Sequence, residues 1–286
     1  MFHKITNTII LIFIIVRNYI YDISLYYCIN MAKYISKLSS KLKNGEVIKY
    51  ISWKLKIDRF TNLIVTIWCQ LLNLITLIFL PFPKSYIAVK YLSLKFSPSD
   101  INKHLKTIYE LTLECDSVFE TGVRGVVSSW AFLNGLKNNQ KANYLLNDIE
   151  NCDVDLLLKT AKKIKLDCNF VISNNLNLEF NKNYDLTFID TWHVYAQLAR
   201  ELEKFESITS KYIVLHDTTV DGEYGEAIRF NNDTESLAKI TGYPKEEIEK
   251  GLWPAVEEFL ANNSNWKLYK NFTHNNGLTI LKKDEH

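Results

Sequence analysis

Short apolar runs and amphipathic segments alternate along the chain from residue 100 onward. The apolar runs, bounded by polar or turn residues, predict buried strands, and the amphipathic segments predict helices. This alternation is typical of a parallel sheet with helices on both faces. The predicted strands span 117–120, 144–149, 168–173, 184–190 and 211–215, and the predicted helices span 100–114, 126–136, 155–165 and 194–205.

The C-terminal end of the chain departs from this alternation. Residues 244–262 predict two helical pieces, the second beginning at Trp253-Pro254, because proline suits the first turn of a helix. Two further strands, 266–273 and 278–283, are joined by Asn275-Asn276-Gly277, which is a hairpin signal. The pattern therefore predicts an α/β fold, a Rossmann-like doubly wound sheet that ends in an antiparallel hairpin.

The first 95 residues differ, and we expect them to form a helical, basic and apolar region that precedes an α/β domain at 96–286. Residues 5–16 are uncharged and mostly apolar, but twelve residues are too few to span a bilayer. A signal anchor, an interfacial helix and an extension upstream of a start at Met31 all fit this segment.

Residues 60–83 carry no charge, and their apolar part reaches roughly 30 Å as a helix, enough to cross a hydrocarbon core. A lysine-rich stretch precedes them, which suits an anionic lipid surface. One polar stripe, from Asn62 to Thr76, also fits a helix docked on protein. The sequence therefore leaves two alternatives, membrane association and a buried docking helix, and the run from Pro81 to Pro83 ends the segment in either case.

Charge separates the same two regions. Residues 1–95 hold 13 lysines and arginines against 3 acidic residues, a net charge of +10, whereas residues 96–286 hold 21 against 29, a net charge of −8. The acidic region lacks the basic surface that nucleic acids require, so no nucleic-acid partner is expected. The basic region makes a membrane surface the better partner, and the chain is expected to be membrane-associated or cytoplasmic. The five cysteines show no metal-binding spacing.

Glycine is scarce, and eight of the nine glycines follow residue 120. After the first predicted strand, Glu120-x-Gly122-x-x-Gly125 offers a turn at which a ligand can approach the backbone closely. Gly135 is expected to end the helix that follows this turn. The loop at 218–229 contains two more glycines and is either a mobile cover over a substrate or a plain surface loop.

Carboxylates and histidines come at the ends of two neighbouring predicted strands. Asp190 and His193 follow one strand, and His216 and Asp217 end the next. Because the carboxyl ends of parallel strands meet at one sheet edge, these side chains are expected to lie close together. Such a set can hold a hard divalent cation with open water positions. No partner is assigned to His104, His274 or His286.

The predicted fold and these motifs resemble class I S-adenosylmethionine-dependent methyltransferases, in particular catechol-type O-methyltransferases and cephalosporin-hydroxylase-like proteins. The resemblance covers residues 100–283. It implies that S-adenosylmethionine is the cofactor and that Asp148 accepts hydrogen bonds from its ribose hydroxyls. If the register of the strand differs, Glu150 takes this role instead. The implied cofactor-binding residues are Glu120, Gly122, Gly125, Asp148 and Asn174.

The same resemblance assigns roles to the strand ends. It implies that Asp190 and Asp217 bind Mg²⁺ or another divalent cation, with Thr218 at the third ligand position. Relatives with two acidic residues at the second strand end make His216 the extra ligand instead. His193 falls where the family has its base, and imidazole suits that role.

The resemblance thus implies an enzyme that methylates a hydroxyl of a small-molecule or glycan acceptor, with the assistance of a metal ion. A catalytically silent, membrane-tethered scaffold of the same fold is the alternative, because the glycine spacing is one residue shorter than in the family motif. A sugar-modifying enzyme of related topology is a third hypothesis.

Overall fold

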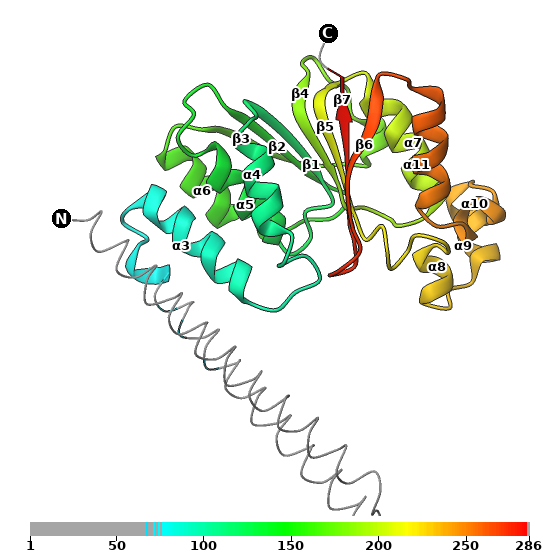
Figure 1. Cartoon of the computed structure of the whole chain (residues 1–286). Coiled ribbons are helices and arrows are strands. Elements are labelled where there is room, and N and C mark those ends of the chain that lie inside the picture. Colours follow the sequence, from blue (N-terminus) through cyan, green and yellow to red (C-terminus); the bar gives the residue numbers. More distant parts are fainter. Residues whose placement is uncertain (1–66, 68–70, 72–73, 75, 285–286) are drawn as a thin grey trace, which may run out of the picture. The chain divides into compact units, whose positions relative to one another are not determined.

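The computed structural model describes residues 67, 71, 74 and 76–284, and residues 73–286 form one compact unit (Figure 1). The predicted segment at 5–16 and most of the predicted helix at 60–83 lie outside the described residues. Within the described part of the chain, no helix combines the length and the apolar character needed to cross a bilayer.

A seven-stranded sheet forms the centre of this unit, in the order β3-β2-β1-β4-β5-β7-β6. The first five strands are parallel, and β7 lies antiparallel between β5 and β6. The predicted doubly wound sheet with a closing antiparallel hairpin is therefore confirmed. The strands are β1 (Ser117–Thr121), β2 (Asn143–Asp148), β3 (Asp167–Ile172), β4 (Tyr184–Ile189), β5 (Thr209–His216), β6 (Trp266–Phe272) and β7 (Leu278–Lys283).

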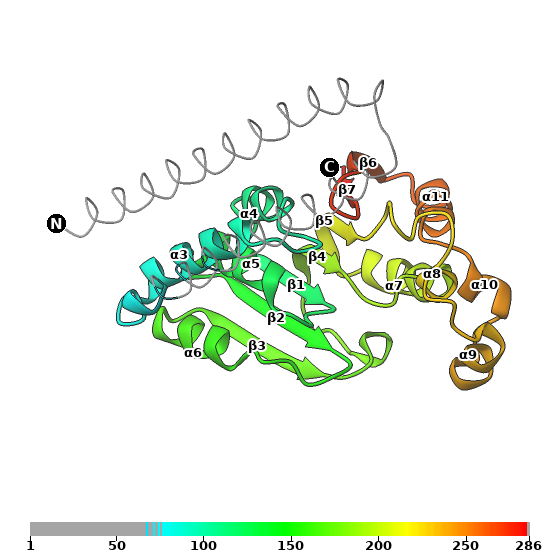
Figure 2. The ribbon, with the colours of Figure 1, turned by 90° about the horizontal axis from the view of Figure 1, so that it is seen from below.

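Helices flank the sheet in two groups. The group α3–α6 lies beside β1–β3, and the group α8–α11 lies beyond β4 and β5, as both views show (Figures 1 and 2). The helices are α3 (Pro83–Phe96), α4 (Leu105–Thr112), α5 (Val127–Leu136), α6 (Asp155–Lys163), η1 (Asn175–Asn177), α7 (Tyr195–Glu206), α8 (Glu226–Arg229), α9 (Thr234–Thr241), α10 (Lys245–Glu249) and α11 (Trp253–Asn262).

The sequence predicts a helical region up to residue 95 that is interrupted at Pro81 and Pro83, but it does not predict a helix that begins at these prolines, as α3 does. Pro83 instead occupies the first turn of a new helix, where its missing N–H costs nothing. Buried α3 side chains pack on α4, α5 and α6, and the Tyr86 ring meets Trp130 of α5 edge-on at 5.6 Å. Residues 83–95, which the sequence pattern groups with the first region, thus pack as part of the α/β unit.

Two further helix predictions need correction. The helix expected from Asp100 begins only at Leu105. The Asp100 carboxylate forms an ion pair with Arg124 and does not cap the helix. The helix α9 was not expected. Asp233 caps it by accepting the backbone N–H groups of Glu235 and Ser236, and Gly242 ends it with φ +73°. Capping and a left-handed end residue explain a helix whose side chains are mostly exposed.

Gly135 does not end α5 as predicted but lies inside it. A Cβ atom at this position would come within 2.6 Å of the Cβ and Cγ2 atoms of Thr112, on α4. The glycine therefore allows α4 and α5 to approach closely, so that contact between helices rather than helix punctuation explains it.

The hairpin turn between β6 and β7 fastens residues 97–104 to the sheet. Asn275 Oδ1 accepts the backbone N–H of Lys103 at 2.8 Å, and the Nδ2 group of Asn275 donates to the Ser99 carbonyl at 2.8 Å. His104, to which no partner was assigned, is buried with Nε2 2.8 Å from the His274 carbonyl oxygen. These contacts hold Asp100 at the edge of the sheet.

We expect Gly135→Ala to lower the free energy of unfolding by about 1–3 kcal/mol, because the added methyl overpacks the contact with Thr112. This loss outweighs the gain of about 1 kcal/mol that alanine brings to a helix interior. Urea denaturation measures the difference. Gly125→Ala is the control, because its nearest new contact, Val127 Cγ2, lies at 3.8 Å. A Gly135→Ala variant as stable as the unaltered chain would contradict the packing explanation.

Candidate functional site

A cavity of about 730 Å³ opens at the carboxyl ends of β1, β2 and β4. It lies where the strand order changes direction between β1 and β4, the position at which open α/β sheets bind ligands. Its wall contains Gly122, Gly125, Asp148, Glu150 and Asn174, which lie before β4 in the chain, and Asp190, Trp192, His193, Glu226 and Tyr243, which lie after it. The structure thus brings most of the predicted site residues to one cavity.

The turn after β1 is pressed against the end of β4. Gly122 has φ +86°, and a Cβ atom there would lie 1.8 Å from the carbonyl oxygen of Asp190. The Asp190 N–H donates to the Thr121 carbonyl at 3.0 Å. Arg124 and Val126 also have positive φ, at 35° and 58°. A positive φ is unfavourable for a β-branched residue such as Val126. Gly122 is therefore required by packing against β4.

Gly125 differs from Gly122, because the space beside it is open. Its φ is not in the left-handed region, and the nearest atom to an added Cβ is Val127 Cγ2 at 3.8 Å. Since Gly125 lines the cavity, this space is available to a ligand rather than filled by protein. Packing of the protein does not require a glycine here, whereas close approach of a ligand to the backbone does.

Glu120 lies beneath the turn, fully buried and outside the cavity wall. Its carboxyl group accepts hydrogen bonds from the hydroxyl of Tyr144 and, at 2.5 Å, from that of Ser128. Burial raises the pKa of Glu120 to about 7, although these hydrogen bonds oppose the shift. Because Ser128 does line the cavity, Glu120 acts on the cavity through the residues it orients.

Asp148 and Asn174 reach the cavity wall, and each also holds the backbone in place. Asp148 Oδ2 accepts the N–H of Arg124 at 2.9 Å, and Oδ1 accepts that of Glu150 at 3.0 Å. Asn174 Oδ1 accepts the N–H of Leu176 at 2.9 Å and so caps η1. The Asp148 carboxylate thus fastens the glycine turn to the end of β2.

A buried polar network under the cavity was not predicted. Glu201 of α7 is fully buried, and its carboxylate accepts hydrogen bonds from Thr191 at 2.7 Å and from Asn175 at 2.5 Å. Asn175 also donates to Thr121 at 2.9 Å, and Thr121 donates to Asn147 at 2.9 Å. This chain links the ends of four strands. One signal was present in the sequence, because Glu201 falls on the apolar stripe of its helix.

Elsewhere on the cavity wall, His193 is surrounded by carboxylates. Its Nε2 lies 3.1 Å from Asp190 Oδ1. Its Nδ1 lies 3.0 Å from Glu226 Oε2, 3.2 Å from Asp217 Oδ2 and 3.5 Å from Asp221 Oδ2. Asp221 and Glu226 were not predicted as site residues, because the segment 218–229 shows no strand or helix pattern, although α8 begins at Glu226.

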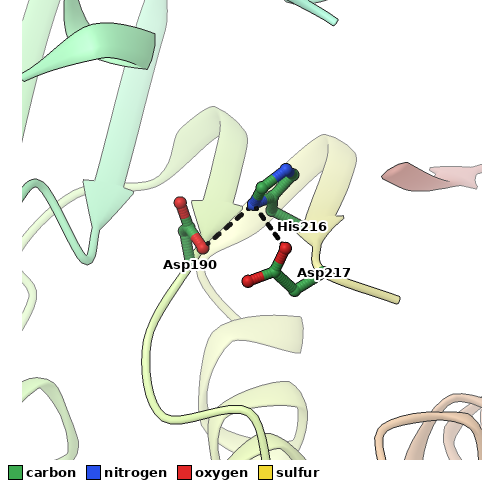
Figure 3. Close-up of side chains that lie close together, drawn as sticks. All are labelled: Asp190, His216 and Asp217. Carbon is green, nitrogen blue, oxygen red and sulfur yellow. Dashed lines mark hydrogen bonds and ion pairs between the residues drawn. The ribbon is translucent and has the colours of Figure 1, made fainter. Parts of the chain in front are cut away.

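The predicted metal-binding residues Asp190, His216 and Asp217 also converge (Figure 3). His216 Nδ1 lies 3.2 Å from Asp190 Oδ1 and 3.3 Å from Asp217 Oδ1, and one atom from each residue falls within 4.8 Å of the others. His216 Nε2 and Asp217 Oδ1 are buried and have no hydrogen-bond partner among the described residues. Asp217 also has φ +57°, so its backbone is strained at this position.

These charges shift one another's pKa values. Burial opposes the protonation of His193, but hydrogen bonds to Asp190 and Glu226, together with the charges of Asp190 and Asp217, raise its pKa to about 10. Burial would raise the pKa of Asp190, but the charge of His216 and the hydrogen bonds from both imidazoles hold it well below its usual range. Burial is the largest cause of the raised pKa of Asp217. The cluster therefore favours bound positive charge.

Thr218, which the resemblance placed at the third ligand position, is directed toward β7. Its hydroxyl is buried and accepts a hydrogen bond from Thr279 Oγ1 at 2.9 Å. In this structure the third donor beside Asp190 and Asp217 is His216, as in the alternative that the resemblance allowed.

We expect the stability of the chain to depend on pH through Glu120. The folded state holds this proton more strongly than the unfolded state, so stability is present at low pH and is lost as pH rises from 4.5 through about 7. Relative to Glu120→Gln, the unaltered chain should lose roughly 3 kcal/mol of its free energy of unfolding between about pH 5 and pH 8. Urea denaturation across this range measures it, and parallel profiles for the two proteins would show the assignment to be wrong.

No protein-family model matches the chain, and no curated protein matches it. Solved structures with similarity include the N-methyltransferase NodS from Bradyrhizobium japonicum WM9, at 9% identity over 65% of this chain and 97% of that one, with a TM-score of 0.41. The O-methyltransferase TomG from Streptomyces achromogenes, solved in complex with SAM, has 11% identity over 71% and 90% of the two chains and a TM-score of 0.46.

A third similar structure is a putative caffeoyl-CoA O-methyltransferase from Staphylococcus aureus, with 14% identity over 64% of this chain and 83% of that one and a TM-score of 0.42. The strand order and the antiparallel β7, rather than these values, identify the architecture. On that ground the chain has the class I methyltransferase fold that its sequence resembles.

Proposed function

We propose that this protein is an S-adenosylmethionine-dependent methyltransferase that acts on a hydroxyl group of a small-molecule or glycan acceptor. The observation that carries the proposal is the cavity at the switch point of the sheet, whose wall contains both an open glycine turn and the charged side chains of Asp190, His193 and Glu226. Its volume of about 730 Å³ lies within the range of small-molecule and cofactor sites.

The part of the wall at the glycine turn suits the cofactor. Gly125 leaves open space beside the backbone, and the oxygens of Asp148 and Glu150 line the wall nearby and can accept hydrogen bonds from ribose hydroxyls. Asn174 lines the same wall and offers an amide group to the base. S-adenosylmethionine, when bound, would supply a methyl group on a positively charged sulfur.

The part of the wall that follows β4 in the chain suits the acceptor. Asp190 and Glu226 present carboxylate oxygens that can accept hydrogen bonds from hydroxyl groups. The rings of Trp192 and Tyr243 lie nearly parallel, with their centroids 6.3 Å apart, and form an apolar wall beside these carboxylates. The protein would contribute mainly by aligning the acceptor oxygen with the methyl group and by excluding water.

His193 retains its predicted role as the base under one condition. Both of its ring nitrogens face carboxylates, and a pKa of about 10 keeps the imidazole protonated at neutral pH. To accept a proton from the acceptor, His193 must first lose one, which requires that the negative charge around it be neutralised.

The residues Asp190, His216 and Asp217 fit a divalent cation. Two carboxylates and one imidazole converge, and Asp217 Oδ1, which lies 3.3 Å from His216 Nδ1, is buried and makes no hydrogen bond among the described residues. A cation held there would lower the pKa of the acceptor hydroxyl and orient it. The mixed oxygen and nitrogen set accommodates several divalent metals, Mg²⁺ included.

For the residues that precede α3 we keep the proposal of a membrane-surface anchor. It is supported by the 10 lysines and arginines against 3 acidic residues in 1–82, beside the uncharged run at 60–83. The acceptor could then be presented at a lipid surface, although the proposed chemistry depends only on residues of the cavity and its cluster.

We expect Gly125→Val to lower the affinity for S-adenosylhomocysteine by about tenfold or more, because its side chain would occupy the space left for the ligand. Isothermal titration calorimetry measures the affinity. Thermal unfolding serves as the control, since the protein has open space at this position and the variant should fold normally. Tight binding of the cofactor product by the variant would contradict the proposed position. No binding by the unaltered chain would instead favour the catalytically silent scaffold.

A further inference from the structure

A second group of side chains, which the sequence analysis did not assemble, meets at His193 Nδ1. Three carboxylate oxygens lie within 3.5 Å of this nitrogen, from Asp217, Asp221 and Glu226. The three ligand atoms of His193, Asp217 and Asp221 also lie within 4.8 Å of one another. One N–H group can form a well-aligned hydrogen bond with only one of these oxygens.

The other ring nitrogen limits the choices further. His193 Nε2 is placed to donate to Asp190 Oδ1 at 3.1 Å. In the neutral imidazole with its proton on Nε2, the lone pair of Nδ1 then points toward three carboxylate oxygens. That form is repulsive unless a cation lies among the four atoms. A proton on Nδ1, as in the imidazolium form described above, supplies one positive charge, whereas a divalent ion supplies two.

The burial of these groups makes repulsion costly. The side chain of Asp221 is fully buried, that of Asp217 is 9% exposed and that of His193 is 12% exposed. Among the described residues, Arg229 is the cationic side chain that pairs with Asp221, through hydrogen bonds of 2.6 and 2.8 Å. Asp217 Oδ1 has no hydrogen-bond partner in the same part of the chain. The Asp217 carboxylate, which faces both clusters, is therefore nine-tenths buried, and one of its oxygens makes no hydrogen bond within the described residues.

The separations are those of a metal site. Ligand nitrogen and oxygen atoms about 2.0–2.2 Å from a tetrahedral ion lie roughly 3.4 Å apart, and His193 Nδ1 lies 3.2 Å from Asp217 and 3.5 Å from Asp221. We propose that His193 Nδ1, Asp217 Oδ2 and Asp221 Oδ2 form a second divalent-cation site, with Glu226 beside it on the cavity wall. Asp217 then bridges two ions, because its other oxygen faces His216.

The surroundings of these ligands are also those of a metal site. Histidine ligands usually donate their second N–H to a carboxylate, as His193 does to Asp190. Carboxylate ligands are usually held by an outer hydrogen-bond donor, as Arg229 holds Asp221. A set with one imidazole and two or three carboxylates favours Mn²⁺, Fe²⁺ or Zn²⁺ over Mg²⁺.

The second ion would add a link between two segments that a backbone hydrogen bond already joins, from the Glu226 N–H to the His193 carbonyl at 2.9 Å. His193 lies between β4 and α7, whereas Asp217 and Asp221 lie between β5 and α8, and Glu226 begins α8. In this arrangement His193 binds the second ion and therefore does not act as the base. The proposal does not depend on methyl transfer, since it follows from the cluster alone. It shares only Asp217 with the metal site proposed above.

The test is the number of Mn²⁺ ions bound per chain, measured on the untagged full-length protein by native mass spectrometry and electron paramagnetic resonance. The unaltered chain should bind two ions with a spin-coupled spectrum, because one carboxylate bridges them. His216→Asn and Asp221→Asn should each bind one ion and lose the coupling. The exposed Glu223→Gln, in the same loop as Asp221, is the matched control and should still bind two.

Asp221→Asn leaves Arg229 without its partner, so Asp221→Asn/Arg229→Gln provides a second variant, and thermal unfolding checks the fold of both. At most one ion in the unaltered chain, or two coupled ions in both Asp221 variants, would overturn the proposal. Calorimetry with S-adenosylhomocysteine on the same samples separates this result from the proposed methyl transfer. Two ions without cofactor binding would refute only the methyltransferase, and cofactor binding with one ion would refute only the second site.

Discussion

The close approach of Gly122 to the Asp190 carbonyl is the constraint on which the rest of the site depends. No side chain fits between them, because a Cβ atom would lie 1.8 Å from the carbonyl oxygen. The contact holds the turn after β1 against the end of β4 at the point where the sheet changes direction. On one side of it lies the open wall at Gly125. On the other lies the cluster that begins with Asp190.

Electrostatics imposes the second constraint. Asp190, Asp217, Asp221 and Glu226 crowd around His193 in a partly enclosed space. Buried carboxylates without compensation destabilise a fold, so their positive partners are part of the structure rather than additions to it. Arg229 is one such partner, and the two imidazoles are others. The remaining imbalance is a physical reason to expect metal ions, which methyl transfer to a hydroxyl can use.

The fold was largely predictable, because hydrophobic periodicity determines which segments are strands and which are helices. The strand ends carrying Asp190 and Asp217 were predictable for the same reason. Asp221 and Glu226 were not, because a loop and the four-residue helix α8 are too short or irregular to show periodicity, and their position depends on contacts that form only in the folded chain. Gly135 was misinterpreted because the sequence does not show that Thr112 packs against it.

If the cavity at the ends of β1, β2 and β4 binds S-adenosylmethionine beside a metal-binding cluster, a crystal structure of the chain with S-adenosylhomocysteine and Mn²⁺ will show it. We expect the nucleoside between Gly125 and Asp148, and anomalous density for Mn²⁺ beside Asp217. A cavity empty of the nucleoside at saturating concentration, or a nucleoside bound at another surface, would rule out this binding site.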